Sequence, residues 1–218
     1  MTLPLPPLAA GALLAAALAA GPALAAKDVT FAVASTFTTT DPYDANDTLS
    51  QAMAKSFYQG LYGFDKDMKM IPVLAESHEV TKDGLVYTFK LRKGVRFSDG
   101  SEFTAADVVA SIERVPKVPK SPSPFTAYTK QITKIDVVDP YTIRFRTAQP
   151  YPLMPSDMVQ IAIVSKSAAG ASTDDFNTGK AAIGTGPYKL VRYAKGDRIE
   201  LERNDNWWGG KTPWEKVT

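Results

Sequence analysis

The sequence predicts an α/β fold in which strands outnumber helices and much of the strand pairing is antiparallel. Short runs of alternating apolar and polar residues recur along the chain, and Gly, Asp-Gly and Asp-Pro turn signals bound them. Two further segments place apolar residues on one helical face directly after a capping residue. With 218 residues, 44% of them hydrophobic, the chain is long enough to bury a core in one or two domains.

The first predicted elements are a strand, a loop and a helix. Apolar residues alternate with smaller or polar ones over residues 29–33, which is typical of a strand. A threonine-rich polar loop follows over residues 35–46. Asp47 is placed to cap a helix that extends to about Gln59, and Gly60 can end it.

The middle of the chain predicts a strand, a helix and an irregular loop. Residues 85–91 alternate between two glycine-containing turns, so we expect a strand. Thr104 and Asp107 have the spacing of a capping box and open a helix that extends to about Arg114. Four prolines fall within residues 116–124, which no helix or sheet interior tolerates.

The remaining residues predict two hairpins separated by a strand and a loop. Residues 135–146 read as a hairpin around an Asp-Pro turn, and residues 188–203 as a second hairpin around Lys-Gly-Asp. Between them, residues 158–164 indicate a strand and residues 169–180 a loop.

The first 26 residues differ from the rest because they carry no charged side chain. An Ala/Leu run at 8–18 is followed by Gly21-Pro22 and then by small residues, which is typical of a secretory signal cleaved after Ala25 or Ala26. We therefore expect a periplasmic protein. No Lys or Arg precedes the run, which leaves open a start upstream of Met1. The alternative is an uncleaved anchor that tethers an interaction domain to the membrane.

Composition excludes several classes of function. Lys plus Arg number 25 and Asp plus Glu 23, so the net charge of +2 gives no support for nucleic-acid binding. The absence of cysteine excludes disulfides, thiolate metal sites, a cysteine nucleophile and lipid-modified cysteine. His78 is the single histidine, and we expect it to be an exposed strand residue. We predict no catalytic residue, no metal and no cofactor. The alternative from another class is a secreted hydrolase, but the sequence lacks the G-x-S-x-G turn that would carry its nucleophile.

Short motifs rich in Gly, Tyr and Asp are spread over most of the chain. They are Gly60-Leu61-Tyr62, Pro72 to Ser77, Asp83 to Val95, Phe97 to Gly100, Phe103 to Val108, Gly184 to Tyr188, and Leu201 to Asn204 with Trp207-Trp208 after it. In this order they resemble the family 5 extracellular solute-binding proteins, which are the peptide-, nickel- and glutathione-binding receptors of ABC importers. The segment from Asp41 to Gln51 is most similar to the glutathione-binding subgroup.

The resemblance implies capture of small peptides, with glutathione as one candidate, for ABC transporter permease subunits in the membrane. It also implies a monomer that closes on its ligand and performs no chemistry. Nickel complexes, opines or sugars are alternative cargoes on the same fold.

The resemblance implies a periplasmic-binding-protein type II-like fold with two lobes. After the signal at 1–26, residues 27–56 and 165–218 would form the N-terminal lobe, its second part incomplete, and residues 57–164 an extra subdomain. The second lobe would follow Thr218 and is missing, so we expect a truncated chain, and a non-functional fragment is an alternative. With one lobe, we expect weak binding or none, because closure buries the ligand from both sides.

The loop before the first helix is the candidate ligand-binding site. A peptide needs hydrogen-bonding groups along its backbone and charged partners at its ends. Tyr43 could pack on an apolar side chain, Asn46 could bind a peptide group, and an aspartate could meet an ammonium. The alternative is that Asp47 only caps the helix and Asp44 makes an Asx-turn. The candidates are Thr38, Thr39, Tyr43, Asp44, Asn46 and Asp47.

Two further groups of residues carry competing interpretations. Gly184, Gly186 and Pro187 could cradle a phosphate, but a P-loop Lys-Ser/Thr is absent and a structural turn before a hairpin is favoured. The three tryptophans could stack on a ligand. The favoured interpretation is that they pack against the lobe or are exposed where the missing lobe would lie.

Overall fold

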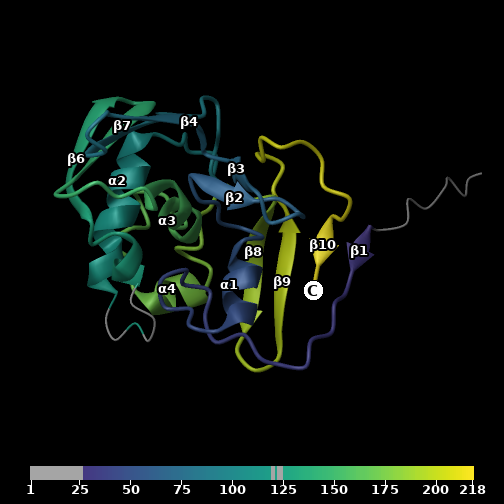
Figure 1. The fold of residues 1–218 in the computed structure, drawn as a ribbon. Coiled ribbons are helices and arrows are strands. Elements are labelled where there is room, and N and C mark those ends of the chain that lie inside the picture. Colours follow the sequence, from purple (N-terminus) through teal and green to yellow (C-terminus); the bar gives the residue numbers. More distant parts are fainter. Residues whose placement is uncertain (1–26, 119–120, 122–124) are drawn as a thin grey trace, which may run out of the picture.

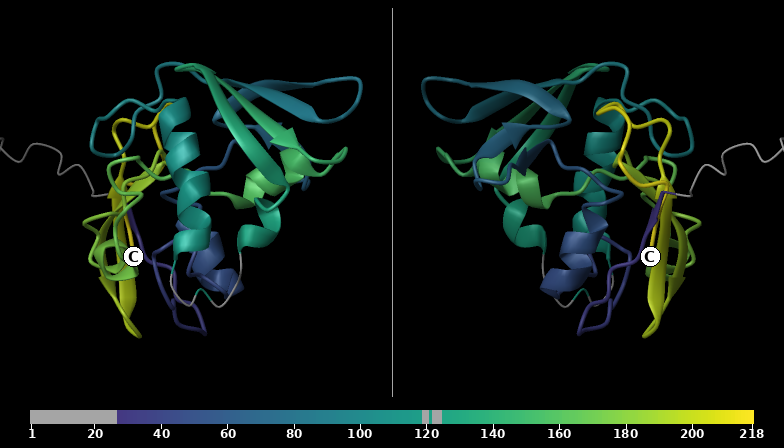
Figure 2. Two further views of the ribbon diagram at one scale, coloured as in Figure 1. Left: turned by 90° about the vertical axis from the view of Figure 1, so that its left-hand side faces the viewer. Right: turned by 90° about the vertical axis from the view of Figure 1, so that its right-hand side faces the viewer.

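The computed structural model describes residues 27–118, 121 and 125–218. The predicted signal at 1–26 and part of the proline-rich loop therefore lie outside the described residues. Within them, the predicted α/β class with more strands than helices is confirmed. Figure 2 shows the two larger sheets on opposite sides of the molecule.

The first sheet joins the two ends of the described chain. Its strands are β8 (Tyr188–Ala194), β9 (Arg198–Arg203), β10 (Lys216–Val217) and β1 (Asp28–Val29), in the order β1-β10-β9-β8. β8 and β9 form the predicted second hairpin. β1 and β10 pair in parallel and lie side by side in Figure 1.

The second sheet is antiparallel throughout and is formed by a continuous part of the chain. It contains β4 (Ala75–Val80), β5 (Val86–Leu91), β7 (Thr142–Thr147) and β6 (Ile132–Asp139), in the order β4-β5-β7-β6. The predicted strand at 85–91 and the predicted hairpin at 135–146 are confirmed in it. A separate small hairpin pairs β2 (Tyr62–Phe64) with β3 (Met70–Pro72).

The helices connect and cover these sheets. They are α1 (Thr48–Ala54), α2 (Ala105–Arg114), α3 (Met154–Gln160) and α4 (Thr173–Asn177), with short 3₁₀ turns η1 (Val115–Lys117) and η2 (Phe125–Tyr128). The predicted capping box of α2 is present, because the Asp107 carboxylate accepts a bond from the backbone N–H of Thr104 at 2.8 Å. None of the helices in the described ranges has the length and apolar character needed to cross a bilayer.

The first helix was predicted with the wrong extent. α1 begins after its predicted cap but ends at Ala54, not near Gln59. Gly60 lies against the backbone of the α3 region, where a Cβ atom would come within 2.7 Å of the Met158 carbonyl oxygen. Close packing explains this glycine better than a helix stop does.

Residues 158–164 were predicted as a strand, but they begin inside a helix. Pro155 occupies the first turn of α3, a position where a missing N–H costs nothing. Ile163 then forms an isolated bridge with Gln59. The larger apolar side chains of this run are all buried, so their hydrophobicity did not distinguish a helix end from extended backbone.

The other differences are at short elements. The first strand was expected to extend over residues 29–33 but ends at Val29, and Thr30 to Val33 remain exposed. The predicted loop at 169–180 contains α4, whose capping box joins Ser172 and Asp175.

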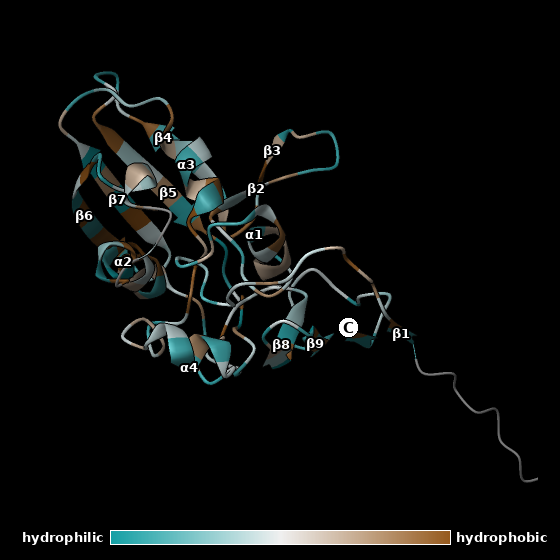
Figure 3. Cartoon of the chain, turned by 90° about the horizontal axis from the view of Figure 1, so that it is seen from below, coloured by the Kyte–Doolittle hydropathy of each residue, from teal (hydrophilic) through white to brown (hydrophobic). Residues whose placement is uncertain are grey.

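The core of the second sheet is formed by the inward residues of its two central strands. Figure 3 shows hydrophobic and hydrophilic bands alternating along them. Phe89 of β5 and Phe145 of β7 are fully buried, and their ring centroids are 5.0 Å apart. A second cluster of buried residues lies around α1, α4 and the β8–β9 hairpin, and includes Phe57, Phe176 and Leu201.

Candidate functional site

The polar loop at 38–47 has an inner and an outer side. Thr39 and Tyr43 are buried, with 2% and 0% of their surface exposed. Thr38 and Asn46 are exposed, while Asp44 and Asp47 are half-buried. The structure therefore brings four of the six candidates to the surface and turns two inward.

Tyr43 has a packing position in the structure. Its hydroxyl donates to the Ala162 carbonyl oxygen at 2.5 Å, and its ring centroid lies 5.8 Å from that of Phe125. Burial raises the pKa of the Tyr43 phenol, which stays protonated and donates. This ring connects the loop to the core and offers no exposed face to a ligand.

Asp47 caps α1. Its carboxylate accepts bonds from the backbone N–H of Ser50 and from the hydroxyl of Thr38, both at 2.7 Å. Desolvation acts to raise the pKa of Asp47, but the bonds from Thr38 and Ser50 together hold it below its usual value. The capping role that was the alternative interpretation is therefore present.

Asp44 and Asn46 form the outward tip of the loop. Burial, followed by the neighbouring Asp41 carboxylate, raises the pKa of Asp44, while Lys195 and Arg114 act to lower it. The Asx-turn proposed for Asp44 is made by Asp41, which accepts the backbone N–H of Tyr43 at 3.1 Å. Asp44 is left with a half-exposed carboxylate that a cation could approach.

Sequence reasoning missed the ion pair beneath this loop. Asp41 was interpreted as part of a turn, and Arg114 only as the end of a helix. The structure pairs them through two bonds, at 2.8 and 2.6 Å, and both side chains are buried. The available signal was the spacing of Asp107, Ser111 and Arg114, which places three polar residues on one buried face of α2.

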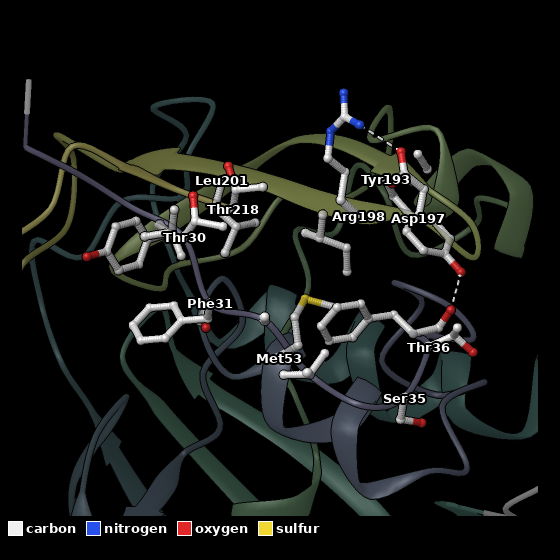
Figure 4. A pocket seen from close by; sticks show the side chains of 18 of the residues that line it. Thr30, Phe31, Ser35, Thr36, Met53, Tyr193, Asp197, Arg198, Leu201 and Thr218 are labelled. Carbon is white, nitrogen blue, oxygen red and sulfur yellow. Dashed lines mark hydrogen bonds and ion pairs between the residues drawn. The ribbon is translucent and has the colours of Figure 1, made fainter.

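An apolar groove of about 630 Å³ leads up to the loop and was also missed. The exposed segment Thr30–Phe37 forms one wall, Met53 of α1 the floor, and β8–β9 the opposite wall, as Figure 4 shows. The Tyr193 hydroxyl closes one end by donating to the Phe37 carbonyl oxygen at 2.7 Å. The groove ends at residue 37, directly before the first candidate residue of the loop.

The Gly184 to Pro187 segment is a structural turn, as favoured by the sequence. A Cβ atom on Gly184 would lie 1.9 Å from the Phe57 carbonyl oxygen, and one on Gly186 would lie 2.7 Å from Phe57 backbone atoms. The glycines therefore allow two backbones to touch. Trp208 also packs, since its Nε1 donates to the Gln59 side chain at 2.9 Å and the Arg92 guanidinium lies 4.3 Å from its ring.

His78 was predicted to be exposed, but in the structure it is half-buried in β4. Its Nδ1 lies 2.7 Å from the Tyr62 hydroxyl, and its ring packs beside Phe89. Among the described residues there is no group of three His, Asp or Glu side chains that could hold a metal ion.

Comparison with known proteins assigns the chain to a family. The family described as bacterial extracellular solute-binding proteins, family 5 Middle, matches residues 69–218. The chain is 44% identical over 211 residues to the glutathione-binding protein GsiB of Salmonella paratyphi A. The match covers 94% of this chain and 41% of that relative, so the chain spans about two fifths of its length.

Solved structures agree with this assignment. The periplasmic binding protein DppA of Helicobacter pylori, in complex with the peptide STSA, has a TM-score of 0.75 and 31% identity. NikZ of Campylobacter jejuni, in complex with Ni(L-His), has a TM-score of 0.71 and 30% identity. Each match covers 87% of this chain, and 41% and 37% of the respective structures. The fold is therefore that of type II periplasmic binding proteins, with the coverage of one lobe, and the chain belongs to the family 5 bacterial extracellular solute-binding proteins.

Proposed function

We propose that this chain contributes the solute-contacting lobe of a binding protein that captures small peptides, with glutathione as the first candidate, for an ABC importer. The observation that carries the proposal is the outer side of the 38–47 loop. On this loop, whose inner side is buried, Asp44 and Asn46 present a carboxylate and an amide to solvent. The exposed Thr38 adds a hydroxyl that donates to the Asp47 carboxylate and can still accept a bond.

These three groups fit the chemistry of a small peptide. A carboxylate pairs with an ammonium group through charge-assisted hydrogen bonds, and an amide side chain can bind a peptide group at both donor and acceptor. The names of the relatives support this cargo: glutathione for GsiB and a tetrapeptide for DppA. A nickel complex is the alternative cargo that NikZ favours.

The same proposal includes export and a division of labour within the chain. Residues 1–26 would be removed as a signal, which places the protein in the periplasm with the permease as its membrane partner. Residues 27–56 and 165–218 would form the lobe, and residues 57–164 the extra subdomain. The two four-stranded sheets support that division, because each draws its strands from one of these parts. Capture, rather than catalysis, would be the whole activity.

A chimaeric protein tests the cargo. Residues 27–218 would replace the matching part of the Salmonella relative, and calorimetry would measure binding of glutathione, dipeptides and Ni(L-His). We expect micromolar or tighter binding of glutathione or a dipeptide. A folded chimaera that binds none of these peptides would contradict the proposal, and one that binds Ni(L-His) alone would favour the alternative cargo.

Two matched variants localise the contact. In the chimaera, Asp44→Asn should weaken peptide binding by about tenfold, because a charge-assisted bond is worth roughly 1.5–3 kcal/mol. Asp67→Asn changes an exposed aspartate in the β2–β3 turn and should leave affinity unchanged. Equal affinities for both variants would remove Asp44 from the site.

The 218-residue chain alone should bind these peptides weakly or not at all. A ligand on one open surface keeps much of its hydration, whereas closure between two surfaces excludes water from both sides. Micromolar affinity of the isolated chain would show that a closing second surface is not required.

A further inference from the structure

Asp41 lies at the centre of the 38–47 loop and is completely buried. One carboxylate oxygen accepts bonds from the Tyr43 backbone N–H at 3.1 Å and from Arg114 Nη1 at 2.8 Å. The other accepts bonds from Arg114 Nη2 at 2.6 Å and from the Thr173 hydroxyl at 2.9 Å. Four donors from three separate parts of the chain therefore meet at one carboxylate.

Arg114 is the last residue of α2, and only 4% of its side chain is exposed. Its guanidinium carbon lies 4.3 Å from the centre of the Phe176 ring and 5.4 Å from that of the Tyr43 ring. The planar fork of arginine matches a carboxylate through two parallel bonds, and its flat faces pack on aromatic rings. Lysine could not make both contacts.

α4, which includes Thr173, makes further bonds to the inner side of the same loop. The Asn177 side-chain oxygen accepts bonds from the Thr39 hydroxyl at 3.0 Å and from the Thr40 backbone N–H at 2.8 Å. The Thr40 hydroxyl donates to the Phe176 carbonyl oxygen at 2.8 Å. The inner side of the loop is thus bonded at three successive residues, while Asp44 and Asn46 project outward.

We propose that Arg114 is a positioning residue for solute capture: through Asp41 it fixes the shape of the loop that presents Asp44 and Asn46. The inference rests on the proposed function of that loop. A buried ion pair is a poor source of stability, since apolar residues of similar volume often serve as well. A loop fixed before the solute arrives loses less conformational freedom on binding, which increases affinity.

Amide hydrogen exchange of the 218-residue chain tests the structural half of this inference without a ligand. The double substitution Asp41→Asn with Arg114→Gln removes both charges together and leaves no unpaired ion. We expect exchange at the Tyr43 and Asp44 amides to rise about tenfold, which corresponds to roughly 1.4 kcal/mol of local opening, with no change at Phe89 in β5. Unchanged loop exchange, or an equal rise at Phe89, would overturn the inference.

Two further variants keep the test decisive. Glu113→Gln is the matched control, because it removes the charge of the residue next to Arg114 in α2 and the Glu113 side chain is exposed. It should leave loop exchange within about twofold. Arg114→Lys keeps the charge, so it tests the loop even where the double variant does not fold. It should give a smaller rise in loop exchange than the double variant, and no rise would count against Arg114.

Affinity in the chimaera tests the functional half. Arg114→Lys should weaken peptide binding about threefold to tenfold, while Glu113→Gln should leave it unchanged. If the parent chimaera binds no cargo, the proposed function fails, and the exchange data still decide whether Arg114 fixes the loop. If cargo binds equally well in both variants, the positioning role is contradicted and the proposed function stands.

Discussion

The two four-stranded sheets differ in how completely their apolar faces are covered. The central strands of β4-β5-β7-β6 bury Phe89, Ile143 and Phe145 without any exposed surface. Beside β1-β10-β9-β8, the apolar groove stays open, and 63% of Phe31 is exposed at its edge. The β4-β5-β7-β6 sheet comes from one continuous part of the chain, whereas the β1-β10-β9-β8 sheet joins segments from both ends. Contiguous sequence encloses its own core here, whereas the sheet assembled from distant segments leaves a face uncovered.

The largest effect expected from this comparison is at the centre of the enclosed sheet. Phe89→Ala removes a ring that packs on Phe145, Tyr62 and His78. It should lower the free energy of unfolding by about 3–5 kcal/mol, as large-to-small changes of buried aromatics do. Urea denaturation would measure this, with the half-exposed Val80→Ala as a control expected to change it by about 0.5 kcal/mol or less. Similar losses for both would mean that this core is loosely packed.

The second effect is expected at the turn before β8, where a glycine lets two backbones touch. Gly184→Ala places a methyl group where the Phe57 backbone already lies, and neither backbone can move away without disturbing its hydrogen bonds. We expect the free energy of unfolding to fall by about 3 kcal/mol. Gly170→Ala is the matched control, since a Cβ there meets nothing within 4 Å, and it should stabilise slightly, by about 0.4–1 kcal/mol. A tolerated Gly184→Ala would show that the two backbones are not in contact.

Alkaline pH should weaken the fold through buried tyrosines. Burial raises the pKa of Tyr62 to about 12 from an ordinary value of 10.0, and it also raises that of Tyr58. Their contribution to stability is complete below pH 10 and falls as pH rises toward 12, because the unfolded chain releases these protons first. Denaturation curves across this range would show the decline. Tyr62→Phe should make the decline shallower, and an unchanged slope would exclude Tyr62 as a cause.

The smallest effect is expected at the open groove. Phe31→Ser changes a residue that is mostly exposed, so the free energy of unfolding should change by about 0.5 kcal/mol or less. The contrast with Phe89→Ala sharpens the difference between the two sheets. A loss comparable to that of Phe89→Ala would mean that the groove is closed in solution.

Local sequence signals predicted most of the regular elements. The capping box at Thr104, the cap at Asp47 and both hairpins are set by short-range chemistry, and each is present. The α3 region was predicted wrongly because the larger apolar residues of 158–164 are buried both in the helix and after it, so they show neither period clearly. The early end of the first strand could not be predicted either, since Phe31 and Val33 alternate correctly and pairing partners determine where a strand stops.

The candidate site was predicted only as a segment. Sequence reasoning selected the loop at 38–47 as the candidate but could not separate its inner side from its outer side. Tyr43 points inward, where it packs on Phe125 and donates to the Ala162 carbonyl oxygen, and both partners lie far along the chain. Such long-range contacts leave little trace in a single sequence.

The central claim is that the outer side of the 38–47 loop, and not the apolar groove, contacts the solute. Amide exchange of the chimaera with and without glutathione tests it directly. Slower exchange on ligand addition at Asp44 and Asn46, with no change at Phe31 or Leu201, is the expected result. Protection confined to the groove wall, with the loop unaffected, would contradict the claim.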